Sequence, residues 1–425
     1  SFDRDVLTNK KKEKMLDPIE ITMEAVKTFS DPHYDNSAKS LFLYPEILAP
    51  ILANVVPEYQ GIRAEQVMEY IVKSSIRRDG VDSASALVTA QQTEPGSLGE
   101  KVIRYDSHFL AKNPRLSTKA IRIDLHIDLE KLQKGDYLLQ CMACFVHLEP
   151  EREKSPLLAC LEEIDIFYRL LEQYPDDLMQ VRTAADIQTL LTSGKRGMML
   201  TVEEGGACLD SLGALRDLYR LGVRMMTLTW NFKNGLAEPN IVPGTDDMWP
   251  RPANTTGGLT EKGLEFVEEM QRLHMLVDVS HLSDAGIWDI LRVAKRPFVA
   301  SHSNARACCP HVRNLTDEML TAMGEKGCLI GLNYCASFLD TNPDRSQVRS
   351  RITDMARHAR YIMDKAGEDC LALGSDFDGI DGDLEIAGAQ DMPKLAEGLK
   401  KEGIPERVVE KIFYGNAVRF FSENL

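Results

Sequence analysis

Residues 276–307, LVDVSHLSDAGIWDILRVAKRPFVASHSNARA, contain the pattern that decides the fold. Two short apolar runs, 276–280 and 297–301, are each followed at once by a histidine, His281 and His302, and an amphipathic helical segment separates them. This order predicts a β-α-β unit, whose parallel strands end on the same edge of a sheet. We therefore expect both imidazoles at one mouth. A metal site explains two histidines there; the alternative is that each histidine is a polar residue that caps its strand.

The same alternation continues over the chain from about residue 120. Helical patterns separate eight apolar runs, at residues 121–128, 141–147, 197–202, 224–230, 276–280, 297–301, 328–333 and 370–375. Strands that alternate with helices in this way predict an α/β fold, a (β/α)8 TIM barrel. A doubly wound open sheet is the main alternative, but no glycine-rich phosphate loop follows the first run.

In such a barrel the chemistry lies just after the carboxyl ends of the strands. The residues at those positions include many metal-ligand and acid–base types: His126, Asp128, His147, Glu203, Trp230, His281, His302, Asn333 and Asp376. Glu203 is suited to bridge two ions, since a carboxylate has two oxygens to share; the alternative is a surface carboxylate beside Glu204. His126 and Asp128 would face the same side of a strand and are the candidates for a further ion.

Composition excludes several classes of protein. The net charge of −15 argues against a nucleic-acid partner, which needs a basic patch. No apolar run reaches the roughly 18 residues of a membrane helix, and the first residues lack the apolar core of a signal peptide. The nine scattered cysteines fit reduced thiols. Cys141 and Cys144 would point to opposite faces of a strand, so we expect no zinc or redox site there. These features predict a cytoplasmic protein without membrane contact.

Residues 1–118 differ from the rest of the chain in sequence pattern. We predict that they form a separate α+β extension before a barrel at residues 119–425. The runs VIRYDSHF and IRIDLHIDLE resemble a fragment of a PD-(D/E)XK nuclease-family transposase over about residues 1–125. The resemblance makes Asp106, Asp128 and Glu130 the metal-ligand candidates. Leu132 stands where that pattern has Gln or Lys, so we predict an inactive fused fragment rather than a working nuclease.

Six stretches from His126 onward resemble the membrane dipeptidase (renal dipeptidase, peptidase M19) family of the amidohydrolase superfamily. They are HIDLEKLQKGDYLLQ, TVEEGG, LGVRMMTLTWNF, LVDVSHLS, ASHSNARA with HVRNLTDE, and GSDFDGI. The resemblance implies a (β/α)8 barrel with two Zn²⁺ ions. It makes Glu203 the bridging carboxylate, His281 and His302 ligands of one zinc, Asp376 the catalytic carboxylate, and Arg313 the group that binds the substrate carboxylate. Trp230 stands where animal members have a substrate-contacting histidine, which suggests a bacterial branch.

The sequence departs from that family at its start. HIDLEKLQKGDYLLQ is similar to a segment that follows the family's first strand, so the family's first metal-ligand pair has no direct match. His126 and Asp128 are the candidates to replace that pair; the alternative is that they bind no metal. We predict a zinc-dependent dipeptidase that hydrolyses small dipeptides. The alternative is a catalytically impaired barrel that retains one metal, and a third hypothesis is a nuclease-like, DNA-associated protein. The resemblance also implies a homodimer, because family members are commonly dimers. Composition leaves the oligomeric state open.

Overall fold

The computed structural model describes residues 71–78, 107–112, 120–121, 125–148, 155–245 and 248–425. They belong to two compact units that are divided between Asp124 and Leu125. In the first unit, β1 (Ile71–Arg78), β2 (Ser107–Lys112) and β3 (Ala120–Ile121) pair as an antiparallel sheet in that order. Asp106, a candidate of the nuclease-like pattern, lies outside the described residues.

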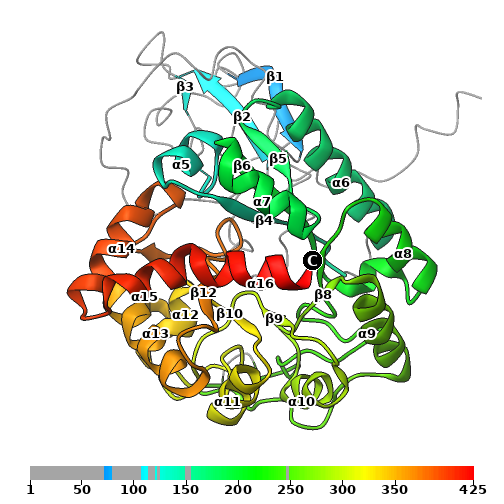
Figure 1. Cartoon of the computed structure of the whole chain (residues 1–425), viewed down its shortest axis with the longest axis vertical. Helices are drawn as coiled ribbons and strands as arrows, with labels where there is room; N and C mark the ends of the chain where they lie inside the picture. The colour runs from blue at the N-terminus through cyan, green and yellow to red at the C-terminus, as the bar shows by residue number, and fades with distance from the viewer. Residues whose placement is uncertain (1–70, 79–106, 113–119, 122–124, 149–154, 246–247) are drawn as a thin grey trace, which may run out of the picture. The chain divides into compact units, whose positions relative to one another are not determined.

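A curled parallel sheet forms the centre of the second unit (Figure 1). Its pairing order is β12-β10-β9-β8-β7-β6-β4, and a further strand, β5, pairs with β6 off this path. The strands are β4 (Leu139–Phe145), β5 (Leu178–Gln180), β6 (Arg196–Glu203), β7 (Met225–Thr227), β8 (Leu276–Asp278), β9 (Val299–Ala300), β10 (Leu329–Leu332) and β12 (Leu371–Leu373). The predicted α/β class and the parallel arrangement of the barrel strands are confirmed.

Helices surround the outer face of this sheet in chain order (Figure 1). They are α6 (Pro156–Gln173), α8 (Leu212–Arg220), α9 (Glu261–Leu273), α10 (Asp284–Val293), α11 (Asp317–Glu325), α13 (Ile352–Ala366), α14 (Met392–Lys401) and α15 (Glu406–Glu410). A further helix, α7 (Ala184–Ser193), contacts β6. The shorter elements are α5 (Leu129–Lys134), α12 (Ala336–Leu339), β11 (Arg349–Ser350) and β13 (Asp383–Leu384). Serine or threonine N-caps begin most of the long helices, as at Ser155, Thr260 and Ser283, where the hydroxyl oxygen accepts a hydrogen bond from the first turn. Each cap fixes the residue at which its helix begins, and therefore the length of the loop that precedes the helix.

The prediction for the first apolar run is wrong in its described second half. Residues 125–128 form no strand, and Asp128 is instead the N-cap of α5, accepting a hydrogen bond of 2.7 Å from the Lys131 amide. An aspartate before a helix satisfies an amide that would otherwise lack a partner. This local interaction ends the extended chain at Asp128, and the parallel sheet begins only at β4.

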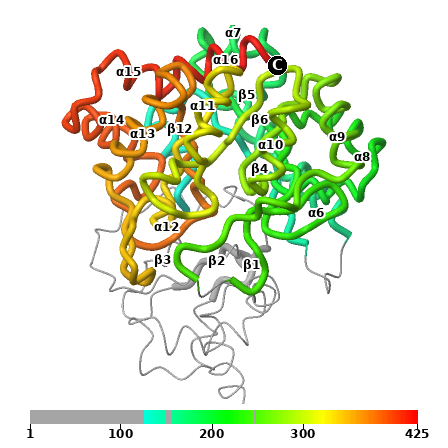
Figure 2. Tube along the Cα trace, turned by 90° about the horizontal axis from the view of Figure 1, so that it is seen from below, coloured from blue at the N-terminus to red at the C-terminus, as the bar shows by residue number. Residues whose placement is uncertain are grey.

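The last helix, α16 (Asn416–Asn424), covers the amino-terminal end of the sheet. Phe420 and Phe421 are buried in one apolar cluster with the first residues of four strands: Met225 of β7, Leu276 of β8, Val299 of β9 and Leu329 of β10. Figure 2 shows α16 beside α7 at one end of the unit and α12, which follows β10, toward the other. The opposite, carboxyl-terminal end of the sheet is therefore the one that presents loops.

Within the part of the chain that the structure describes, no helix combines the length and the apolar character that crossing a bilayer requires. All nine cysteines lie in that part and are free thiols. Cys141 and Cys144 both lie on β4, as the sequence predicts.

Replacement of Gly331 on β10 with alanine is expected to lower the free energy of unfolding by about 3 kcal/mol. A Cβ there would overlap the backbone carbonyl of Ser301 and press on the Cα of Gly374, so the strands would have to separate. Gly213→Ala in α8 is the control, since its Cβ would meet only Ser211 Oγ at 3.4 Å and alanine favours helix. Denaturant unfolding measures both, and equal stability of the two variants would contradict this account.

Candidate metal centre

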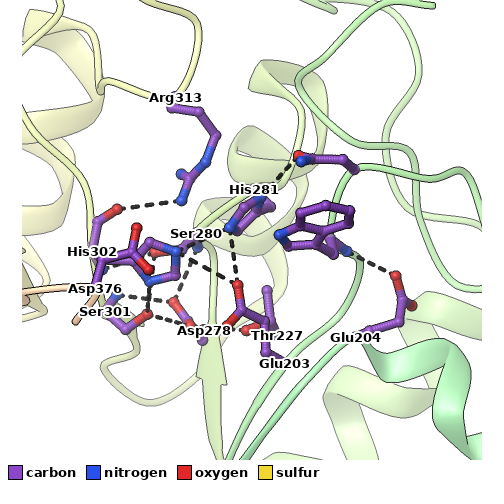
Figure 3. A network of polar contacts seen from close by, with 12 residues as sticks. Glu203, Glu204, Thr227, Asp278, Ser280, His281, Ser301, His302, Arg313 and Asp376 are labelled. Carbon is purple, nitrogen blue, oxygen red and sulfur yellow. Dashed lines mark hydrogen bonds and ion pairs between the residues drawn. The ribbon is translucent and has the colours of Figure 1, made fainter. Parts of the chain in front are cut away.

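Three side chains suited to bind a metal meet at the carboxyl-terminal edge of the sheet (Figure 3). Glu203 is the last residue of β6, while His281 and His302 follow the ends of β8 and β9. His281 Nε2 lies 3.1 Å from Glu203 Oε1 and 2.9 Å from His302 Nε2, and His302 Nε2 lies 3.7 Å from Glu203 Oε1. One ligand atom from each residue lies within 4.8 Å of the other two, a spacing that a single ion can bridge.

The ring orientation of His281 suits metal binding. Its Nδ1 lies 2.9 Å from Oδ1 of Asn231, in the loop after β7. An amide oxygen only accepts hydrogen bonds, so Nδ1 carries the hydrogen and Nε2 presents its lone pair toward Glu203. The same loop is tied to the His281 backbone, because the Asn240 amide donates to the His281 carbonyl over 2.8 Å.

Burial gives these groups unusual protonation properties. The pKa values of His281 and His302 are well below the ordinary histidine value, first because of burial and then because of the nearby Arg313 guanidinium. Burial raises the pKa of Glu203 to about 8, and the carboxylates of Asp376 and Asp278 add to the effect. Neutral imidazoles are the form that binds metal, and a cation would replace the proton that Glu203 otherwise holds.

Several residues at this mouth adopt left-handed backbone conformations, with φ of 69° at His281, 61° at Asp376 and 103° at Glu204. Side chains other than glycine rarely adopt such angles, and they persist where the surroundings fix them. Here they turn the chain sharply after a strand end. The Glu204 carboxylate, buried, holds its turn by accepting hydrogen bonds from the Gly206 amide at 2.7 Å and the Trp230 amide at 2.9 Å.

Asp376 and Arg313 lie beside the three candidate ligands. Asp376 Oδ2 accepts a hydrogen bond of 3.0 Å from Asn333 Nδ2, and its charge acts on Glu203. Arg313 is 3 % exposed, and among the residues that the structure describes its Nε and Nη1 have no hydrogen-bond partner. A buried guanidinium with hydrogens left over is suited to bind an anionic group of a ligand.

The indole of Trp230 contacts the ring of His281, with ring centroids 5.8 Å apart. Its indole also contacts Phe145 at 5.0 Å, His147 at 5.2 Å and Phe232 at 5.8 Å, between ring centroids. These rings form an apolar wall next to the candidate ligands.

The structure does not bring His126 and Asp128 into this cluster. Asp128 caps α5, and His126 is tied to the loop after β12: its Nδ1 accepts a hydrogen bond of 2.9 Å from the Asp378 amide, and its own amide donates to Asp378 Oδ1 over 2.7 Å. Metal binding by this pair stays a prediction. The exposed Asp378, two residues after Asp376, thus holds the segment around His126.

The sequence reasoning missed four polar residues around the candidate ligands, namely Asn231, Glu204, Asp278 and Ser301. Asp278 and Ser301 carried a usable signal, because each is a polar residue inside an apolar run next to a histidine. Asn231 lies in a loop without periodicity and carried none.

A model of the family described as membrane dipeptidase (peptidase family M19) matches residues 81–424. The match begins inside the segment predicted to be nuclease-like, and the nuclease resemblance finds no support in it. Among curated proteins, the chain is 29 % identical to the dipeptidase verJ of Clonostachys rogersoniana over 316 residues, which are 72 % of this chain and 77 % of that protein.

Two solved structures share the fold. One is a dipeptidase AC, a metallopeptidase of family M19, with a TM-score of 0.64, 28 % identity and coverage of 71 % of this chain and 90 % of that one. The other is a metallopeptidase from Rhodobacter sphaeroides bound to a phosphinate mimic of the dipeptide L-Ala-D-Ala, with a TM-score of 0.64, 26 % identity and coverage of 71 % and 91 %. The chain therefore belongs to the membrane dipeptidase family of metallopeptidases, peptidase family M19.

Proposed function

We propose that this protein is a zinc-dependent dipeptidase that hydrolyses the peptide bond of small dipeptides. The observation that carries the proposal is the pairing of two kinds of group at one mouth. The ligand atoms of Glu203, His281 and His302 lie close enough together to hold a divalent ion, and the buried guanidinium of Arg313 lies beside them with hydrogens to donate. A ligand with a carbonyl and a carboxylate a few bonds apart would engage both.

Each residue of the proposed site has a separate role in the hydrolysis. When bound, the ion supplies Lewis acidity toward the scissile carbonyl and the attacking water. Arg313 binds the terminal carboxylate of the dipeptide and so sets its register. Asp376 takes the proton of the attacking water at a carboxylate oxygen and returns it to the leaving amine. Trp230 and its neighbouring rings exclude water from one side of the site.

A second zinc is part of this proposal, with His126 and Asp128 as its predicted ligands after a rearrangement of residues 125–128. Asp128 would have to leave the helix cap, and His126 would have to release the Asp378 amide. A homodimer and a cytoplasmic location stay predictions.

The first test is the zinc content of the purified protein, with hydrolysis of a dipeptide panel that includes L-Ala-D-Ala. We expect at least one zinc per chain and turnover that a chelator abolishes and added Zn²⁺ restores. About two zincs would support the rearranged pair, while one would place the ion at Glu203, His281 and His302. Zinc-free protein that turns over dipeptides, or zinc-loaded protein that does not, contradicts the proposal.

A further inference from the structure

A chain of buried hydrogen bonds connects Asp278 with the ring of His302 (Figure 3). Asp278 is the last residue of β8 and is 3 % exposed. The Ser301 hydroxyl donates to Asp278 Oδ2 over 2.5 Å, and the same hydroxyl lies 2.7 Å from His302 Nδ1. The chain thus joins the ends of two neighbouring strands, β8 and β9, through one serine.

The neighbours of Asp278 set the direction of these hydrogen bonds. The backbone amides of Ser280 and Ser301 donate to Oδ1 over 3.0 Å and 2.9 Å, and the Thr227 hydroxyl donates to Oδ2 over 3.0 Å. Among the described residues, every hydrogen-bond partner of the carboxylate is therefore a donor. The Ser301 hydroxyl has a single hydrogen, and its short contact with Asp278 uses it. Only lone pairs remain to face His302, so His302 Nδ1 carries the hydrogen of that contact.

We propose that Asp278 and Ser301 are positioning residues that hold His302 in the Nδ1–H tautomer, so that its Nε2 lone pair is available to a metal ion. The inference rests on the proposed metal site and deepens it. His281 is held in the same Nδ1–H tautomer by a different group, the amide oxygen of Asn231. One ligand is thus oriented by a loop and the other by a buried carboxylate between strands.

The assignment places two nitrogen lone pairs opposite each other at the centre of the site. With hydrogens on both Nδ1 atoms, the 2.9 Å contact between His281 Nε2 and His302 Nε2 brings two lone pairs together and is not a hydrogen bond. Two nitrogens that bind one tetrahedral zinc at 2.0–2.1 Å lie about 3.3 Å apart. A small separation of the rings would therefore admit an ion, which would remove the repulsion between the lone pairs.

Asp278→Asn tests the proposal because it keeps the shape of the side chain and reverses the chain of hydrogen bonds. The new amide donates to Ser301, whose hydroxyl then donates to His302 Nδ1 and leaves the hydrogen on Nε2. We expect zinc affinity of the full chain, measured by competition with a chromogenic chelator, to fall about 10- to 100-fold. In metal-free protein labelled with ¹⁵N-histidine, the nitrogen shifts of His302 should change from the Nδ1–H to the Nε2–H pattern; loss of a signal in His302→Gln assigns it.

Thr227→Val is the matched control, since it removes another donor to the same oxygen of Asp278 and leaves the chain to His302 intact. We expect it to change stability but neither the tautomer nor zinc affinity. Ser301→Ala is the second variant if Asp278→Asn does not fold, and it should weaken zinc binding and mix the two tautomers.

The tautomer is read without metal, which separates this inference from the proposed function. If the wild-type protein binds no zinc but Asp278→Asn still changes the His302 tautomer as predicted, the metal proposal is overturned and the positioning role is supported. Zinc affinity that falls equally in Thr227→Val, or a His302 tautomer that none of the variants changes, overturns the positioning role.

Discussion

Asp376→Asn is expected to lower kcat for dipeptide hydrolysis by about 10²- to 10⁴-fold, the range that a general acid–base group contributes. Asparagine retains an oxygen for the hydrogen bond from Asn333 Nδ2 and nearly the same volume, but it cannot take a proton from water. We expect zinc content to stay at the wild-type level and KM to change little, because Glu203, His281 and His302 are untouched. Steady-state kinetics with elemental analysis of the same sample measures the effect.

Asp378→Asn is the matched control for this prediction. Asp378 lies two residues further along the same loop, is exposed, and accepts its hydrogen bond from the His126 amide through Oδ1, which asparagine preserves. The kcat of the Asp378→Asn enzyme should stay within a few-fold of the wild-type value. An Asp378→Asn enzyme as slow as Asp376→Asn would show that the loop, rather than the Asp376 carboxylate, is what the reaction needs.

Arg313→Lys is expected to lower kcat/KM for free dipeptides by about 10²-fold, since a buried charge pair is worth about 2 to 5 kcal/mol. Lysine keeps the charge but loses the planar fork that matches a carboxylate. The decisive comparison is with dipeptides whose terminus is an amide. Wild type should hydrolyse these poorly, and the variant should discriminate much less between the two forms. The measurement is the ratio of kcat/KM for each dipeptide and its amide.

Arg407→Lys provides the control for a general loss of arginine. Arg407 lies in α15 and makes a two-point contact with Glu368, at 2.7 Å and 3.1 Å. Its replacement should leave the ratio between dipeptide and amide unchanged. If Arg313→Lys also leaves that ratio unchanged, Arg313 does not bind the substrate carboxylate.

The sequence was informative wherever one strand determines the position of one side chain. Glu203, His281 and His302 each follow an apolar run, and parallel strands bring such positions to one edge. The prediction of a strand over residues 121–128 was wrong at residues 125–128 because its alternating pattern competes with the capping preference of Asp128. β5 was missed because its three residues, Leu178–Gln180, are too short to show alternation.

The orientation of the candidate ligands could be predicted less well, because it depends on contacts between distant segments. Asn231 meets His281 across 50 positions of sequence, and no local pattern records that contact. The chain from Asp278 through Ser301 to His302 spans two strands, so it becomes visible only when β8 and β9 pair. A candidate ligand can be predicted from its residue type, whereas the direction of its hydrogen bonds can be determined only from the folded structure.

The position of α16 has a consequence for how the protein is made. Phe420 and Phe421 come after every parallel strand in the chain, yet they cover the first residues of β7 to β10. A ribosome adds about 5–20 residues each second, so a growing chain spends time with all its strands emerged and their apolar base open. During that interval the base can associate with other nascent chains or with chaperones. A stop codon just before residue 416 would remove α16, make that exposure permanent and promote aggregation.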